Sequence, residues 1–143
     1  MKPIAAAFSL ADGAHEVDVK RAEEAIHCKI PNEYRCFLLR HNGGAGFIGD
    51  IHYLDLWPVA QIPKHYSRYQ FSEFLPSFVP IGSNGASEAL VIDASAEPPV
   101  FGFVPFGDLC RASFIPLSAN FAESIELIAS GQAFESREDS EHV

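Results

Sequence analysis

The stretch of sequence that decides the fold reads IPNEYRCFLLRHNGG, from Ile30 to Gly44. Its apolar side chains recur at three- and four-residue spacing, which predicts a helix with one buried stripe. The stripe consists of Tyr34, Phe37, Leu38 and His41. Pro31 is predicted as the first helical residue, where a missing N–H costs nothing. Asn42-Gly43-Gly44 is predicted to end the helix through a left-handed cap.

Helical spacing upstream predicts another helix from Val17 to His27, with an apolar face of Val19, Ala22 and Ile26. Downstream, apolar residues alternate with a period of two, as in strands, and turn residues separate the short segments. The segments are Phe47–Leu56 as one or two kinked strands, an irregular helix from Trp57 towards Tyr69 interrupted by Pro63, strands Phe78–Gly82, Glu88–Asp93 and Val100–Val104, and a short strand or helix approach at Phe114–Leu117. A last helix starts near Ser118 or Asn120, with Asn120 and Glu123 as a capping box, and stops at Gly131.

Two helices, then strands, then a helix predict an α+β fold, in which helices pack on one face of a mostly antiparallel sheet. We expect a single domain over residues 1–131, because no linker divides the apolar segments. Phe101 and Phe103 are expected to pack in its core. Residues 132–143 form a polar, acidic tail for which disorder is expected. The uncovered face of the sheet is then the expected place for recognition.

The chain is acidic, with 19 Asp and Glu against 10 Lys and Arg and a net charge of −9. Four acids and one arginine fall in residues 132–143, so the charge excess is mostly in the domain itself. Such a body repels a phosphate backbone, which excludes ordinary nucleic-acid binding. It attracts a basic protein partner and speeds the encounter.

The location expected from the sequence is the cytoplasm. The three cysteines, Cys28, Cys36 and Cys110, are an odd number without paired spacing, as in proteins of a reducing compartment. The apolar runs are far shorter than the ~20 residues of a membrane helix. The N-terminal run Ile4–Leu10 is also short for a signal peptide, and Asp12 follows it closely.

Three patterns could carry chemistry, and each has a structural interpretation that we favour. Gly44-x-Gly46-x-x-Gly49 follows a predicted helix and enters a strand, the reverse of a dinucleotide site. His27, Cys28, Cys36 and His41 lack the tight Cys pairs of structural zinc sites. Ser83 and Ser87 do not lie in a Gly-x-Ser-x-Gly motif, which forms the elbow of a nucleophilic serine, although His52 or His65 could approach them in space. We therefore expect no enzyme activity, no metal and no cofactor.

The sequence from Glu23 to Gly44 resembles the signature of the SMI1/KNR4 (SUKH) superfamily. The matching residues are Glu23, Pro31, Tyr34, Phe37, Leu38, Asn42, Gly43 and Gly44. Later segments follow in the family's order, including the hairpin around Ser83-Asn84-Gly85, so the resemblance covers about residues 8–131. His27 departs from it, since the family usually has a glycine after the first helix. The resemblance implies that the matching residues are structural, and it brings no catalytic residues.

The resemblance further implies a protein-binding domain, most often a bacterial immunity protein that neutralises a cognate toxin of nuclease or deaminase type. The alternatives are a regulatory scaffold of the same fold and, less favoured, a small-ligand binder or enzyme. The expected partner is a basic toxin protein, with no nucleic acid and no membrane. The residues predicted to meet it are Asp50, Asp55, Trp57, Glu88, Asp93 and Asp108.

Overall fold

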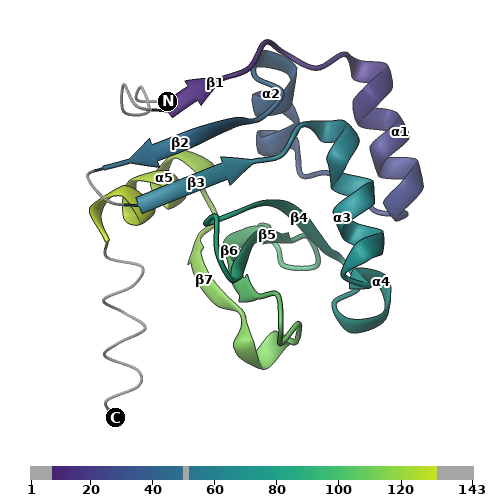
Figure 1. Cartoon of the computed structure of the whole chain (residues 1–143). Helices are drawn as coiled ribbons and strands as arrows, with labels where there is room; N and C mark the ends of the chain where they lie inside the picture. Colours follow the sequence, from purple (N-terminus) through teal and green to yellow (C-terminus); the bar gives the residue numbers. More distant parts are fainter. Residues whose placement is uncertain (1–7, 50–51, 132–143) are drawn as a thin grey trace.

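The computed structural model describes residues 8–49 and 52–131, and within these ranges the chain forms one seven-stranded sheet and five α-helices (Figure 1). The helices are α1 Glu16–Ile26, α2 Asn32–Arg40, α3 Ile62–Arg68, α4 Phe71–Phe74 and α5 Phe121–Ser130. The strands are β1 Phe8–Leu10, β2 Gly44–Ile48, β3 His52–Leu56, β4 Phe78–Ser83, β5 Glu88–Asp93, β6 Val100–Pro105 and β7 Ile115–Ser118. Two 3-10 turns, η1 Val59–Gln61 and η2 Arg111–Ser113, precede α3 and β7. The predicted α+β fold is confirmed, and the predicted tail lies outside the described residues.

The strands follow one another across the sheet in sequence order, and each neighbouring pair is antiparallel. The sheet is weakest in its middle, where β3 and β4 share only the pairs Asp55↔Ser83 and Leu56↔Gly82. In Figure 1, β2 and β3 run side by side, while β4 turns away from them beside α3. The sheet therefore has a β1–β3 part and a β4–β7 part that curl apart.

The two predicted N-terminal helices are confirmed, but α2 begins at Asn32, with Pro31 as its N-cap instead of its first residue, and it does not end as predicted. It stops at Arg40, and His41 is an extended C-cap at φ −143°, so the predicted left-handed cap is wrong. The left-handed residue is Gly43, at φ 89°, where an added Cβ would lie 2.4 Å from the Leu56 carbonyl oxygen. Glycine is needed there because the chain crosses closely over the end of β3.

Other boundaries follow the predictions with local differences. The kinked segment Phe47–Leu56 is two separate strands, and Pro63 lies in the first turn of α3 without interrupting it. The predicted cap of α5 is confirmed, since Asn120 Oδ1 accepts a hydrogen bond of 2.8 Å from Glu123 N. The strand β1 and the helix α4 were not predicted, because three and four residues are too few to show a period.

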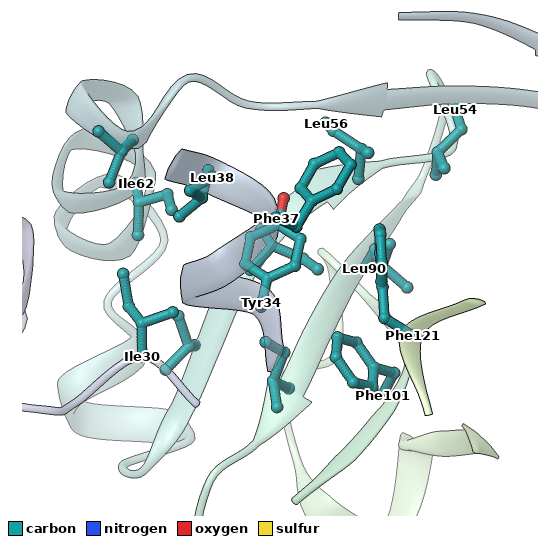
Figure 2. Packing of buried hydrophobic residues seen from close by; sticks show 14 of the residues in the cluster. Ile30, Tyr34, Phe37, Leu38, Leu54, Leu56, Ile62, Leu90, Phe101 and Phe121 are labelled. Carbon is teal, nitrogen blue, oxygen red and sulfur yellow. The ribbon is translucent and has the colours of Figure 1, made fainter. Parts of the chain in front are cut away.

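The main core lies between the sheet and helices α1, α2 and α5 (Figure 2). Tyr34 is at its centre, with its ring centroid 5.2 Å from Phe121 of α5 and 6.3 Å from Phe101 of β6. Phe101 and Phe103 are both 1% exposed, which confirms their predicted core role. We call the side of the sheet that packs on α2 and α5 the inner face.

The opposite side, the outer face, carries a second and smaller cluster over β4, β5 and β6. This cluster consists of Phe71, Leu75, Phe78, Ala89, Val91 and Val104. Phe71 belongs to α4 and Leu75 follows it, so this end of the outer face is covered as well. The part of the outer face that keeps exposed aromatic side chains is formed by β2 and β3.

Candidate partner-binding face

Side chains alternate along β2 and β3, so each strand has an inward and an outward set. Leu54 points into the core at 0% exposure, whereas the cross-strand partners Phe47 and Tyr53 are 48% and 37% exposed. Their rings meet edge to face with centroids 5.5 Å apart. Exposed aromatic rings held in a fixed geometry are typical of protein interfaces.

Asp55 lies two residues after Tyr53 and therefore also on the outer face. Burial raises the pKa of its carboxyl group, and the neighbouring His65 lowers it in part. Within the described parts of the chain, this carboxylate accepts no hydrogen bond and forms no ion pair. Asp55 is thus a partly desolvated acid without a direct hydrogen bond or ion pair among these residues, and the nearby His65 compensates its charge only in part.

His65 of α3 links the end of β3 to the loop after β6 through ring contacts. Its imidazole stacks on Trp57 with centroids 3.8 Å apart and an interplanar angle of 22°, and it lies near-parallel to Tyr69 at 6.3 Å. Tyr69 contacts Phe106 at 4.4 Å. These contacts form two groups of rings, Phe47 with Tyr53, and Trp57 with His65, Tyr69 and Phe106. Asp55 lies between Tyr53 and Trp57 in the chain, and we call the six rings together with Asp55 the aromatic row.

The surroundings of His65 disfavour its protonated form. Its Nδ1 atom is buried and has no hydrogen-bond partner in the described structure. Burial and the positive charge of Arg68 lower the pKa of His65, and Asp55 only partly opposes them. Arg68 itself lies over Tyr69, 5.7 Å from the ring centroid. The row therefore contains the Asp55 carboxylate, which has no direct partner among the described residues, and the Arg68 guanidinium lies at its α3 end.

The six predicted partner residues are distributed unevenly. Asp55 and Trp57 lie together in the row, although Trp57 is only 4% exposed beneath His65. Glu88 and Asp93 are 6% and 7% exposed and are not brought to the row. Asp108 is exposed, and its carboxylate accepts a hydrogen bond from Ser113. Asp50 lies outside the described residues.

Asp93 has structural partners that explain its burial. Its Oδ1 accepts hydrogen bonds from Ser95 N and Oγ at 3.0 and 2.6 Å, and its Oδ2 is 3.2 Å from Arg111 Nη1. Burial alone would raise the pKa of Asp93, but the hydrogen bonds from Ser95 and the charge of Arg111 hold it below its ordinary value. The Arg111 guanidinium also covers the Phe78 ring at 4.9 Å. Asp93 therefore fastens η2 to β5.

The residues that carry the sequence signature support the helical layer, and none of their side chains belongs to the row. Glu23 Oε2 accepts a hydrogen bond of 2.8 Å from Ile30 N, and Glu23 Oε1 pairs with Arg35 Nη1 at 2.9 Å. Asn42 Oδ1 accepts a hydrogen bond of 2.7 Å from Val59 N. The side chains thus fix the α1–α2 turn and hold η1 against the end of α2.

Other candidate sites offer weaker geometry. A polar recess of about 770 Å³ lies at the α1–α2 turn, but its central carboxylate, Glu23, is already paired with Arg35. Gly44-x-Gly46-x-x-Gly49 forms β2 and the turn after it, instead of the strand-to-helix turn of a dinucleotide site. In residues 8–49 and 52–131, no three His, Cys, Asp or Glu side chains gather as metal ligands. No helix in these ranges is long and apolar enough to cross a membrane.

These features define an α+β domain in which α1, α2 and α5 cover the inner face of a curled sheet, α4 covers one end of the outer face, and the aromatic row with Asp55 lies on the rest. The model of the SMI1 / KNR4 family (SUKH-1) matches residues 13–127. The chain therefore belongs to the SMI1/KNR4 family, and the resemblance seen in its sequence is confirmed. No curated protein matches the chain in a sequence comparison.

Of the rings in the row, only Trp57 was predicted as a partner residue; Phe47, Tyr53, His65, Tyr69 and Phe106 were missed. A detectable signal existed for Phe47, because side chains alternate along a strand and place Phe47 on the other face of the sheet from the buried Ile48. The contacts of His65 and Phe106 depend on how α3 and the loop after β6 pack on the sheet, which no local pattern shows.

Proposed function

We propose that this chain is a protein-binding domain of immunity type, which neutralises a cognate bacterial toxin by direct binding. The match to the SMI1/KNR4 family over residues 13–127 carries the proposal. The toxin is expected to be of nuclease or deaminase type, in line with the resemblance. Neutralisation requires a preformed surface and no turnover, so we propose no catalytic residue.

The charge of the chain supports a basic toxin domain as the partner. With a net charge of −9, the chain attracts a cationic protein and repels the nucleic acid that such a protein would act on. Electrostatic attraction mainly raises the association rate and makes binding sensitive to salt. An inhibitor must capture its toxin quickly, which this mechanism favours.

We place the protein in the cytoplasm, where a toxin that attacks nucleic acids would have to be stopped. The three cysteines are free, and Cys36 is exposed on α2. Free thiols in this number are typical of a reducing compartment.

Co-expression with the C-terminal domain encoded by the neighbouring upstream gene tests the proposal. We expect the domain alone to arrest growth, and this chain to restore growth and form a stable complex with it. Persistent arrest without a complex would exclude the immunity role. A complex that leaves growth arrested would favour the scaffold alternative, in which the fold binds proteins without neutralising them.

A further inference from the structure

The described structure leaves one surface whose chemistry is not explained by the fold: the aromatic row around Asp55. We propose that this row is the docking surface for the basic toxin, and that an arginine side chain of the toxin enters it to pair with Asp55. The inference rests on the proposed function and specifies where and how the partner binds.

The state of Asp55 is the first argument. A partly buried carboxylate costs free energy unless a cation or hydrogen-bond donors compensate for its lost hydration. Asp93 shows the compensated arrangement in this same chain, with two donors from Ser95 and one from Arg111. Asp55 accepts no such bond within the described residues. An incoming guanidinium would therefore meet a carboxylate that has already lost part of its water.

The rings around Asp55 are the second argument. Tyr53 precedes Asp55 by two residues and shares its face of β3, and Trp57 follows Asp55 by two residues, just after the strand ends. Aromatic faces attract cations, and the planar guanidinium of arginine stacks on them better than the compact ammonium of lysine. An arginine at this position could pair with the acid and contact Tyr53 at the same time.

The third argument is that the exposed rings are already held in place. Tyr53 packs on the β4–β5 turn, where a Cβ added at Gly85 would lie 2.6 Å from its Cδ1 atom. Phe47 supports Tyr53 from the neighbouring strand at 5.5 Å. Side chains ordered before binding lose less entropy when the complex forms, which is a property of effective interface anchors.

The charge along the chain also fits a basic partner. Residues 8–49, which include α1 and α2, contain six acids and five bases. Residues 52–131 contain eight acids and three bases. The part of the chain that follows β2 therefore carries most of the negative charge of the described residues, which attracts a basic partner.

Binding to the toxin domain tests the surface directly. Asp55→Asn and Tyr53→Ala are each expected to raise the Kd of the complex with the toxin domain by about tenfold or more, as for interface anchors. The matched controls on α1 are Glu24→Gln, which removes an exposed acid, and Val17→Ala, which trims a side chain that is 52% exposed. Both controls are expected to stay within about threefold of the wild type. If the row variants bind as well as the controls while their folds stay intact by circular dichroism, the docking surface is wrong.

A second measurement does not depend on the toxin. N-acetyl-arginine amide is titrated into the free, isotope-labelled protein, with N-acetyl-glutamine amide as the uncharged control. The largest arginine-specific shifts in the ¹H–¹⁵N spectrum are expected at residues 53–57 and 83–85, and Asp55→Asn is expected to abolish them. Equal shifts at acids across the surface would overturn the inference. A wild-type chain that fails to bind the toxin but shows the localised shifts would instead overturn the immunity role and leave the cation site standing.

Discussion

Replacing Glu23 by Gln is expected to destabilise the fold because it removes the charge at the centre of the α1–α2 turn. The carboxylate accepts a hydrogen bond from Ile30 N at 2.8 Å and pairs with Arg35 at 2.9 Å. The side chains of Glu23 and Arg35 are only 14% and 21% exposed. Gln is nearly isosteric and retains one acceptor, but its amide group cannot neutralise the guanidinium.

The magnitude follows from these two contacts. A hydrogen bond to a charged group contributes about 1.5–3 kcal/mol, and a buried ion left without its partner costs about 3–5 kcal/mol. Arg35 keeps a second, exposed partner in Glu16, whose Oε1 lies 3.9 Å from its Nη2, and it keeps some contact with water. These compensate in part, so we expect a loss of about 2–3 kcal/mol in the free energy of unfolding. With a urea m-value of about 2 kcal/mol per M, the unfolding midpoint falls by about 1–1.5 M.

The matched control is Glu24→Gln, because it makes the same change in net charge at the next, exposed residue of α1. We expect that variant to lie within about 0.5 kcal/mol of the wild type. Urea unfolding followed by circular dichroism at pH 7 measures both. A double-mutant cycle with Arg35→Met isolates the pair energy, expected at about 1–2 kcal/mol. The reasoning fails if the Glu23 variant unfolds at the same urea concentration as the Glu24 variant.

Three further outcomes are expected. Tyr34→Phe should leave stability unchanged or raise it by about 1 kcal/mol, because the buried hydroxyl has no hydrogen-bond partner among the described residues; a lower urea midpoint would contradict this. Because the pKa of His65 is lowered, the folded state binds fewer protons than the unfolded chain, so stability is lost as pH falls below about 6.5. His65→Phe keeps the ring on Trp57 and should lose less stability than the wild type between pH 7.5 and 5.5 in parallel urea titrations. Gly43→Ala should cost about 2 kcal/mol or more in the free energy of unfolding, whereas Gly107→Ala, with open space around it, should be nearly neutral, and equal thermal midpoints would refute the steric argument.

The helical part of the fold could be predicted because its evidence is local. The three- and four-residue spacing of Tyr34, Phe37 and Leu38 is a direct consequence of burying one side of a helix. The turn between β4 and β5 could also be predicted, because its Asn-Gly pair is a local turn signal. The left-handed cap was wrongly predicted because Gly43 serves a contact with Leu56, thirteen positions away, and no local pattern distinguishes that cause from a helix end.

The candidate site was predicted only in part, for a related physical reason. Asp55 was identified as an acid near aromatic residues, which charge and composition can indicate. Its lack of a partner depends on how β3, α3 and the loop after β6 come together, and so does the burial of Trp57 under His65. Asp93 had the same appearance in the sequence, yet Arg111, eighteen positions later, satisfies it. Two aspartates that look alike in the sequence, Asp55 and Asp93, thus acquire different surroundings through tertiary contacts.

The positions that identify the family and the positions proposed to select the partner do not overlap. The signature residues from Glu23 to Gly44 fix the α1–α2 turn, fill the core beneath α2 and pass the chain over β3. The aromatic row begins at Phe47 and continues through β3, α3 and the loop after β6. Its exposed members, Phe47 and Tyr53, make none of those contacts, so substitutions there should leave the helical layer intact, whereas the buried Trp57 lies against the crossing at Gly43. It follows that a family match establishes the fold of this chain, while the identity of its partner has to be sought in the chemistry of the outer face.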